Sequence, residues 1–356
     1  MRDQTKRLRE LEQENARLKK GGVLSMAQNN EVYFVTGAAG FIGSHMVERL
    51  LADGHSVTGY DNLSLGRKEW IEHLQSDPRF TFIQADLLEL ETLIQTMEGH
   101  DVVIHLGANT DIRRGNSDYR IDLEDCILAT YNVLEAMRSN NISELLFASS
   151  ATVYGDQWEE PLDEAKGPLL PISLYGAAKL SCESIISAYC HLNDIRAWIF
   201  RFGNVVGARM GHGVLYDFIA KLRRNPQELE VLGDGEQQKN YFMVEDCIEG
   251  MLYAFRNVKE KSCDVFNLGT ETNTQVAAIG HIVAEEMGLK GTKFRYTGGR
   301  RGWPGDQTRI YYDTKKMKRL GWQAKHSSTE AVRIATNRLL QGDDGFRKPG
   351  GAHESA

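Results

Sequence analysis

The chain has 356 residues, enough for one large α/β domain or two smaller ones, and its 41% hydrophobic and 26% charged residues are ordinary for a globular protein. The net charge of −7 argues against nucleic acid as a partner, and no apolar run approaches the ~20 residues of a membrane span. The N-terminus is charged and lacks the apolar segment of a signal peptide, so we expect a cytoplasmic protein with no membrane partner. The five cysteines lack metal-binding spacings, so we expect reduced thiols and no metal.

A short heptad pattern occupies the first 25 residues. Leu8 and Asn15 repeat at one core position of the heptad, and Leu11 and Leu18 repeat at the other. Two heptads are fewer than the roughly three to four expected of a coiled coil, so a frayed charged helix is an equally good interpretation. If a coiled coil forms, Asn15 at its core favours a parallel dimer.

The most informative stretch runs from Val32 to Asp61. An apolar, β-rich run ends at Gly37, Gly40 and Gly43, and the chain then passes directly into a helical pattern with one apolar side. Glycines in such a unit allow a positive φ, a close approach to a pyrophosphate, and tight packing of helix on strand. Asp61 follows 18 residues after Gly43, where a carboxylate can bind the ribose hydroxyls of adenosine and repel a 2′-phosphate. The stretch therefore predicts NAD rather than NADP.

Strand and helix patterns alternate regularly through the first 205 residues. The predicted strands are Val32–Thr36, Ser56–Tyr60, Phe80–Gln84, Val102–Leu106, Leu145–Ser149 and Ala197–Phe202. Such alternation predicts right-handed βαβ crossovers and an α/β fold with a doubly wound parallel sheet of the Rossmann type. Ligands of such a sheet bind outside the carboxyl ends of its strands.

After about residue 205 the pattern changes to helices separated by glycine-rich loops. We expect a Rossmann domain over residues 26–205 and a smaller, mainly substrate-binding lobe over residues 206–340. The lobe is expected to be interleaved with the core, because Val244–Phe255 and Val265–Gly269 have the apolar character of core elements. Residues 341–356 are polar and rich in glycine, which predicts a disordered tail.

Two further stretches carry the candidate chemistry. Ser150 lies in a Ser-rich segment directly after an apolar strand, and Tyr175 and Lys179 stand four residues apart at the start of a helical pattern. This spacing places both side chains on one helical face, where the ammonium lowers the cost of ionising the phenol. Tyr175 is therefore a candidate general base, with Ser150 orienting the substrate proton. His105, after the fourth strand, is interpreted as a buried, hydrogen-bonded histidine.

Taken together, the motifs TGAAGFIGSH, YDNLS, SSATVYG, YGAAK, RFGNVVG and GDGEQ resemble the extended short-chain dehydrogenase/reductase family, in particular its nucleotide-sugar epimerase branch. The resemblance runs from about Val32 to Leu320. It implies a Rossmann domain with a small C-terminal substrate lobe, and catalysis by Ser150, Tyr175 and Lys179. It also implies a homodimer that packs two helices per subunit into a four-helix bundle, here Ile121–Ser139 and Ser173–His191.

The resemblance assigns residues to the two ligands. Those implied for NAD are Gly37, Gly40, Phe41, Ile42, Gly43, Asp61, Asn62, Asp86, Leu87, Leu106, Ala108, Ser149, Tyr175 and Lys179. Those implied for the substrate are Ser150, Thr152, Asn204, His212, Val214, Lys239 and Arg301.

Two of the substrate positions depart from the family pattern. Lys239 stands where many members have arginine, and an ammonium cannot bind a diphosphate bidentately. Arg301 lies five residues before Asp306 rather than in the usual RxGD arrangement, so Arg300, Arg301 and Arg309 are all candidates for the phosphate contact.

The activity implied is a 4-epimerase for a nucleotide-sugar, with a UDP-hexose or UDP-N-acetylhexosamine as substrate and a transient 4-keto sugar. A 4,6-dehydratase or a decarboxylating relative needs a carboxylate in the segment that here reads Ala151-Thr152-Val153. A dehydratase that draws its acid from elsewhere, a reductase of the same fold, and an NAD-bound scaffold without activity are the alternatives. The intact trio argues against the scaffold.

Overall fold

The computed structural model describes residues 30–156 and 160–342. The predicted heptad of residues 1–25 therefore lies outside the described residues, as does the predicted tail from residue 343 onward. The fold below is that of the unit that begins at Val32.

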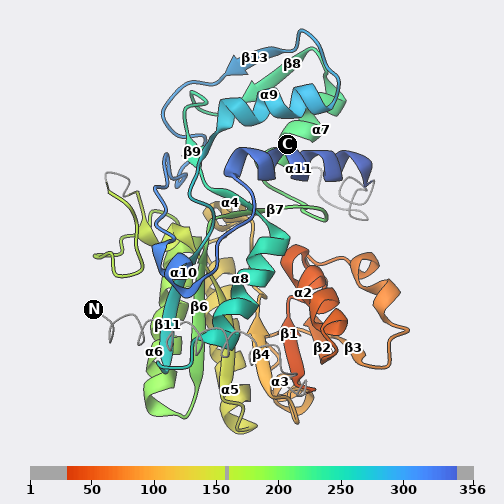
Figure 1. Cartoon of the computed structure of the whole chain (residues 1–356), viewed down its shortest axis with the longest axis vertical. Helices are drawn as coiled ribbons and strands as arrows, with labels where there is room; N and C mark the ends of the chain where they lie inside the picture. Colours follow the sequence, from red (N-terminus) through yellow and green to blue (C-terminus); the bar gives the residue numbers. More distant parts are fainter. Residues whose placement is uncertain (1–29, 157–159, 343–356) are drawn as a thin grey trace, which may run out of the picture. The chain divides into compact units, whose positions relative to one another are not determined.

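Seven parallel strands form the central sheet, in the order β11-β6-β5-β4-β1-β2-β3 (Figure 1). Their bounds are β1 Val32–Thr36, β2 Ser56–Asp61, β3 Phe80–Gln84, β4 Val102–His105, β5 Glu144–Ser150, β6 Arg196–Phe202 and β11 Cys263–Leu268. The first six lie within one residue of the predicted ranges at each end. The strand order reverses between β1 and β4, and ligands of such sheets bind at this point.

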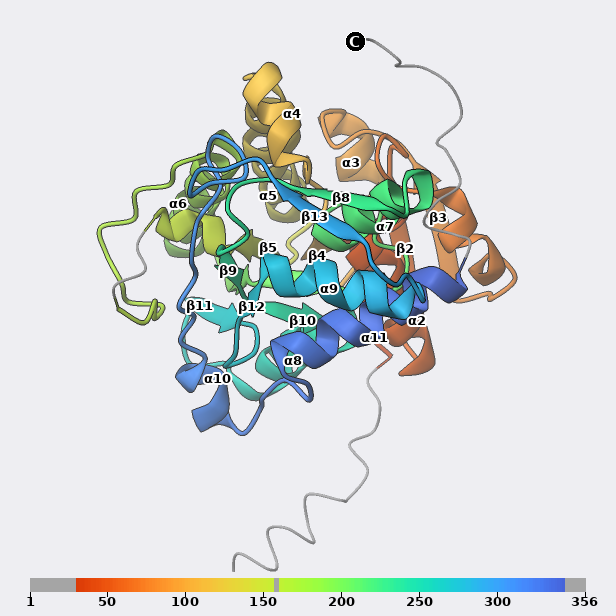
Figure 2. The same ribbon diagram turned by 90° about the horizontal axis from the view of Figure 1, so that it is seen from above.

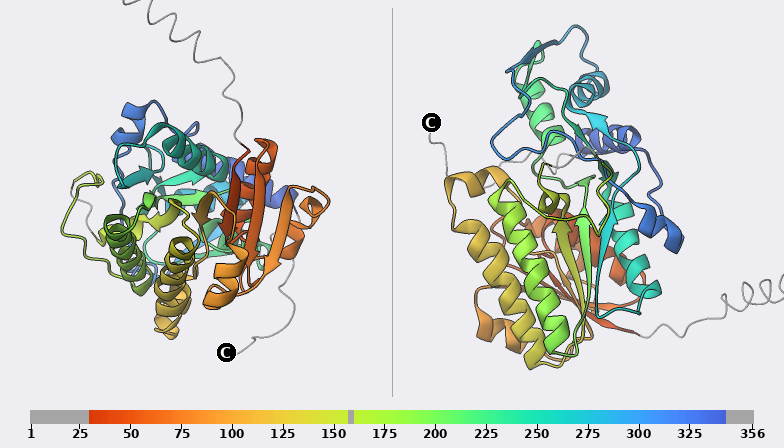
Figure 3. Two further views of the ribbon diagram at one scale, coloured as in Figure 1. Left: turned by 90° about the horizontal axis from the view of Figure 1, so that it is seen from below. Right: turned by 90° about the vertical axis from the view of Figure 1, so that its left-hand side faces the viewer.

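Helices cover both faces of the sheet, which explains why its strands are apolar on both sides. One face is covered by α2 (Phe41–Ala52), α8 (Val244–Asn257) and α10 (Lys315–Leu320), with Met46, Leu50 and Met251 fully buried between them. The other face is covered by α3 (Leu90–Thr96), α5 (Ala129–Ser139) and α6 (Leu174–Leu192). Figure 3 shows α5 and α6 side by side along this second face.

The two helices predicted for a dimer interface differ from each other in regularity. The predicted helix Ser173–His191 is the continuous helix α6, whose N-cap Ser173 accepts a hydrogen bond from the N–H of Gly176. The predicted helix Ile121–Ser139 is instead a π-helical segment, η3 (Leu123–Leu128), followed by α5. Such widened turns are frequent at functional sites, and η3 packs against α6.

A second group of elements packs around its own apolar core beyond the carboxyl ends of the strands. It contains α7 (Val214–Arg224), α9 (Val276–Glu286), α11 (Ser328–Gln341), and the parallel pair β8 (Glu228–Val231) and β13 (Lys293–Tyr296). Figure 2 shows α9 and α11 lying side by side. The short pairs β7 (Asn204–Val206) with β10 (Tyr241–Met243) and β9 (Gln238–Lys239) with β12 (Thr274–Gln275) connect this lobe to the sheet.

The chain returns from this lobe to the sheet. Helix α8 packs on α2, and β11 pairs with β6 at the edge of the sheet. The division at residues 205 and 206 stays a prediction.

The remaining short elements are η1 (Lys68–Trp70), η2 (Glu72–Leu74), α4 (Ile112–Ser117) and η4 (Ala151–Tyr154). Within the described ranges, no helix combines the length and the apolar character that crossing a membrane requires.

Candidate active site

A cavity of about 1260 Å³ lies at the carboxyl ends of β1, β2, β4 and β5 and extends to the loop before α7. It is larger than the ~300–1,000 Å³ typical of a site for one small molecule. Twenty of the predicted residues border it: Gly37, Gly40, Phe41, Ile42, Gly43, Asp61, Asn62, Asp86, Leu87, Leu106, Ala108, Ser149, Ser150, Thr152, Tyr175, Lys179, Asn204, His212, Val214 and Lys239. Arg301 is not among the residues that border it.

The glycine turn forms a tight connection between β1 and α2. Gly37 has a φ of +66°, and a Cβ on Gly43 would lie 1.9 Å from the carbonyl oxygen of Gly37. Gly40 is the N-cap of α2, and this cap contributes no side-chain hydrogen bond to the first turn of the helix. The first N–H groups of a helix have no partner within it, so this end offers donors and a positive dipole to a phosphate.

Asp61 is held in position by backbone donors. The N–H of Leu63 donates to Oδ1 at 2.7 Å and the N–H of Ala39 donates to Oδ2 at 3.0 Å. Burial raises the pKa of Asp61, although these two hydrogen bonds act in the opposite direction. Each carboxylate oxygen keeps a further lone pair with which it can accept a ribose hydroxyl. A Cβ on Gly66 would lie 2.8 Å from Oδ1, which shows how closely the loop after β2 encloses this carboxylate.

A second acidic residue, Asp86, borders the same side of the cavity. The side chain of Asn62 donates to Asp86 Oδ2 at 2.8 Å, and the hydroxyl of Tyr60 donates to the carbonyl oxygen of Asp86 at 2.9 Å. These bonds tie the ends of β2 and β3 together. With the glycine turn and Asp61, they form a cradle whose shape and donors fit an adenine dinucleotide.

The three candidate catalytic side chains come from β5 and α6. The ammonium of Lys179 donates to the carbonyl oxygen of Ala148 at 2.8 Å and lies 5.9 Å from the centre of the Tyr175 ring. Ser150 accepts hydrogen bonds from the N–H of Thr152 at 3.2 Å and from its hydroxyl at 2.9 Å, and it lies close enough to Tyr175 to lower the pKa of the phenol. The structure thus brings the phenol, the hydroxyl and the ammonium together at one end of the cavity.

The charges around Tyr175 act in opposite directions. Burial raises the pKa of the Tyr175 phenol, whereas the charge of Lys179 lowers it, and burial is the larger effect. His105 is buried behind this group, where its ring forms hydrogen bonds to Thr36 at 2.7 Å and Thr130 at 3.1 Å. Burial, together with the charge of Lys179, lowers the pKa of His105 to about 3, so this histidine is neutral and structural as predicted.

The residues predicted to bind the substrate come from short strands and loops that are far apart in the sequence. Asn204 in β7 donates to the carbonyl oxygen of Asn240 through its side chain at 3.2 Å. A hydrogen bond of 3.0 Å joins His212 Nε2, before α7, to the hydroxyl of Thr110, after β4. His212 and Thr110 therefore connect the lobe to the sheet across the cavity.

Two of the candidate phosphate cations, Lys239 and Arg301, are each bound to a carboxylate. Lys239 forms an ion pair with the buried Asp306, which also borders the cavity. Arg301 donates to Asp156 Oδ2 at 2.6 Å, and its side chain is 44% exposed. Reasoning from the sequence did not foresee either acidic partner, because Asp306 and Asp156 are distant in sequence from the cations that they neutralise.

Comparison with known proteins agrees with this geometry. Residues 33–269 match the model of the NAD dependent epimerase/dehydratase family. A relative named as a putative UDP-glucose 4-epimerase from Methanocaldococcus jannaschii is 34% identical over 85% of this chain and 96% of its own length.

Two solved structures are also similar. A crystal structure of UDP-galactose 4-epimerase is 36% identical, with a TM-score of 0.78 over 87% of this chain and 99% of that one. The UDP-glucuronic acid 4-epimerase from Bacillus cereus, solved with UDP-glucuronic acid and NAD, is 27% identical, with a TM-score of 0.78 and the same coverage. Together with the dinucleotide cradle, these likenesses show that the cofactor is NAD.

Proposed function

Because the chain belongs to the NAD-dependent epimerase/dehydratase family, we propose that it is a nucleotide-sugar 4-epimerase that acts through a transient 4-keto sugar. The observation that carries the proposal is the meeting of Ser150, Tyr175 and Lys179 on the wall of the cavity that also contains the cradle for NAD. The segment Ala151-Thr152-Val153, which follows Ser150, has no carboxylate with which to eliminate water. This favours an epimerase over a dehydratase.

The residues that would hold NAD are those of the cradle. The helix end at Gly40 would hold the pyrophosphate, Asp61 would accept the adenosine ribose hydroxyls, and Lys179 would contribute a hydrogen-bond donor to the cofactor. When bound, NAD supplies a reversible acceptor for the hydride from C4 of the sugar and adds a positive charge near Tyr175.

The side chains of the protein carry the proton chemistry. Tyr175, as the phenolate, takes the proton of the C4 hydroxyl, and Ser150 orients that hydroxyl through its own hydrogen bond. Lys179 stabilises the phenolate while Ala148 O holds the ammonium in place. The same phenol returns the proton after the 4-keto sugar presents its opposite face, so the overall reaction is redox-neutral.

The proposed substrate is a UDP-hexose or UDP-N-acetylhexosamine. Asn204, His212 and Val214 border the part of the cavity that would receive the nucleotide-sugar, and Lys239 supplies the positive charge for its diphosphate. Since Lys239 is paired with Asp306, binding a diphosphate requires the ammonium to exchange one anion for another or to share it.

We further propose that the chain forms a homodimer through a four-helix bundle of α5 and α6 from each subunit. Large apolar side chains remain exposed along η3, α5 and α6: Leu123, Leu128, Tyr131, Leu174 and Leu192. Burying these side chains in a dimer would remove apolar area from water. Sedimentation of the protein beside Tyr131→Asp tests this directly, because a charge in the bundle should yield monomers, whereas an unchanged dimer would place the interface elsewhere.

The proposed activity is tested by incubating the purified protein with UDP-glucose and then with UDP-N-acetylglucosamine. The sugar is followed by proton NMR and the cofactor by the absorbance of NADH. A 4-epimer without net NADH supports the proposal and identifies the sugar. An unsaturated or stable 4-keto product would instead assign a dehydratase, and oxidised cofactor from added NADH a reductase.

A further inference from the structure

Three consecutive residues of β5 face three positions of α6 that are one helical turn apart, and two of them form hydrogen bonds to α6. The carbonyl oxygen of Ala148 accepts from Lys179 at 2.8 Å, the hydroxyl of Ser149 donates to Glu183 Oε1 at 2.5 Å, and Ser150 lies close to the Tyr175 phenol. The first and third of these contacts belong to the catalytic group. The second brings a buried carboxylate to the same helical face.

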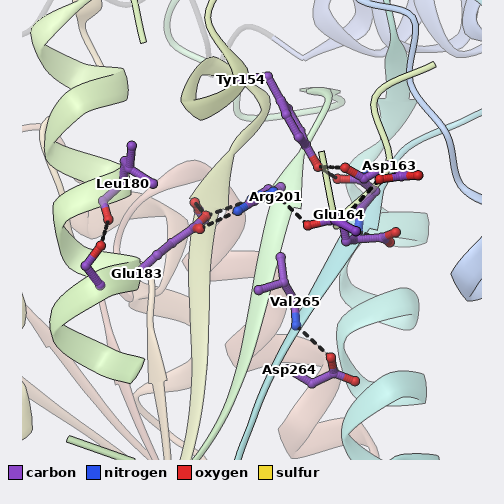
Figure 4. Close-up of polar contacts among 12 residues, drawn as sticks. Tyr154, Asp163, Glu164, Leu180, Glu183, Arg201, Asp264 and Val265 are labelled. Atoms are coloured by element: carbon purple, nitrogen blue, oxygen red, sulfur yellow. Dashed lines mark hydrogen bonds and ion pairs between the residues drawn. The ribbon is translucent and has the colours of Figure 1, made fainter. Parts of the chain in front are cut away.

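Glu183 is bound on both of its carboxylate oxygens by Arg201 from β6. Arg201 Nε donates to Oε1 at 3.0 Å and Arg201 Nη2 donates to Oε2 at 2.7 Å, in a bidentate arrangement between side chains that are 7% and 5% exposed (Figure 4). The guanidinium lies 4.8 Å from the centre of the Tyr154 ring and donates to the carbonyl oxygen of Glu164 at 3.5 Å. Contacts with Tyr154 and Glu164 therefore hold Arg201 in position in addition to the ion pair.

Glu183 stands four residues after Lys179 on α6. Opposite charges at this spacing lie on one helical face and attract each other, and this attraction is stronger when the pair is buried. A carboxylate at position 183 without a partner of its own would therefore draw the ammonium of Lys179 away from Tyr175. In the structure, Arg201 and Ser149 occupy both oxygens of Glu183, and Lys179 donates to Ala148 O instead.

We propose that Arg201 is a positioning residue for catalysis. By binding both carboxylate oxygens of Glu183, it prevents Glu183 from pairing with Lys179 and leaves the ammonium of Lys179 free to act on the Tyr175 phenol. This inference rests on the proposed role of Tyr175 as the catalytic base. Arg201 itself does not border the cavity, so its effect passes through Glu183 and Lys179.

Other groups face the same phenol and ammonium and must stay unchanged in any test. They come from α6, from the η3 region and from β4, and they are Cys182, Cys126, Asp122 and His105. Among the described residues, none of these side chains forms a hydrogen bond or an ion pair with Arg201 or Glu183. A change confined to Arg201 and Glu183 therefore isolates the proposed effect.

Three variants separate this role from a purely structural one. Arg201→Met leaves Glu183 free to pair with Lys179, so the acidic limb of the kcat profile should move to higher pH by about one unit, which is tenfold in rate on that limb. Glu183→Gln removes the competing anion, so the limb should stay in place even if the protein is less stable. The double variant E183Q/R201M should return the limb to its original position.

The decisive measurement is a titration of the Tyr175 phenol in the NAD-bound protein. Tyrosinate absorbance of each variant is recorded against pH and compared with Tyr175→Phe, which removes the signal of this one tyrosine. A pKa of Tyr175 that rises in Arg201→Met and returns in the double variant supports the proposal. A Tyr175 pKa that is the same in all three variants overturns the proposal. A rise in Glu183→Gln as large as the rise in Arg201→Met also overturns it.

Two controls keep the result interpretable. Should Arg201→Met fail to fold, Arg201→Lys keeps a cation but cannot hold both oxygens, and it should give a smaller shift in the same direction; no shift there would contradict the proposal. The titration needs no sugar, so it is independent of the proposed activity. A shift in the titration without epimerisation of any sugar would sustain the positioning role and reject the epimerase.

Discussion

The two ends of the cavity are built in different ways. At the proposed NAD end, the binding groups are backbone N–H groups of a helix end and one carboxylate held by two backbone donors, all within the stretch from Val32 to Leu63. At the proposed substrate end, the binding groups are side chains from short strands and loops that are far apart in the sequence, and the cation Lys239 is already paired with Asp306. On this proposal the NAD end is preformed, whereas Lys239 at the substrate end would have to exchange or share its ion-pair partner when a diphosphate binds.

The largest expected effect is at Tyr175, the proposed base. Tyr175→Phe removes the base but keeps the ring, so kcat should fall by about 10²- to 10⁴-fold while NAD binds as before. Turnover with each sugar and fluorescence titration with NADH check the two halves of this expectation. A variant that retains its turnover would favour the non-catalytic scaffold.

A change at the preformed end should act on the cofactor. Asp61→Asn keeps the shape of the side chain but weakens hydrogen bonds from the ribose hydroxyls, so the Kd for NAD should rise by about 10- to 100-fold and discrimination against NADP should fall. Calorimetric titration with both cofactors measures this. The matched control is Asp53→Asn, a carboxylate that pairs with Arg49 and Arg256 outside the cavity; an equal loss in the control would remove the assignment.

Substitutions of Lys239 and Asp306 should change KM for the nucleotide-sugar in opposite directions. Lys239→Met removes the cation beside the cavity, so KM for the nucleotide-sugar should rise by about tenfold, whereas Asp306→Asn releases Lys239 and should lower KM by a few fold. Arg301→Met should have a smaller effect than Lys239→Met, because Arg301 is partly exposed and does not border the cavity. Steady-state kinetics of the three variants tests the order. The reverse order would make Arg301 the main phosphate contact.

The smallest effect on activity is expected at His105, where the change is in stability. Its pKa is about 3 in the folded protein and about 6.5 when unfolded, so the unfolded chain binds the extra proton first as the pH falls. The contribution of the neutral His105 to the free energy of unfolding is fully present above pH 6.5. It is lost by about 1.4 kcal/mol per pH unit as the pH falls from there towards 3. Urea unfolding between pH 7 and 5 should show this slope. His105→Gln should reduce the slope, and the exposed His191→Gln should not.

The difference between contacts that are local in the sequence and contacts between distant residues explains which features could be predicted from the sequence. The strands and the glycine turn depend on residues that are close together in the chain, so their patterns gave the sheet to within a residue or two at each end. The interruption of the helix at η3 was not predicted, because its sequence is compatible with a continuous α-helix. Lys239 and Asp306 stand 67 residues apart in the chain, and only folding reveals that they pair.

Glu183 is the clearest case of a residue that the sequence left unnoticed. Its position four residues after Lys179 was visible, but nothing local indicates that Arg201, on a strand that follows α6, binds its carboxylate. A buried ion pair between two elements is specified by packing rather than by a motif. The catalytic trio was found because its members lie in short, recognisable segments.

The most direct test of the central claim follows the hydrogen on C4 itself. The protein is incubated with a UDP-hexose deuterated at C4, and both epimers are examined by NMR and mass spectrometry. The account predicts that deuterium remains on C4 of both epimers, without exchange into water and without net NADH. Loss of the deuterium to solvent would contradict it, because epimerisation would then proceed through removal of a proton from carbon rather than through transfer and return of a hydride.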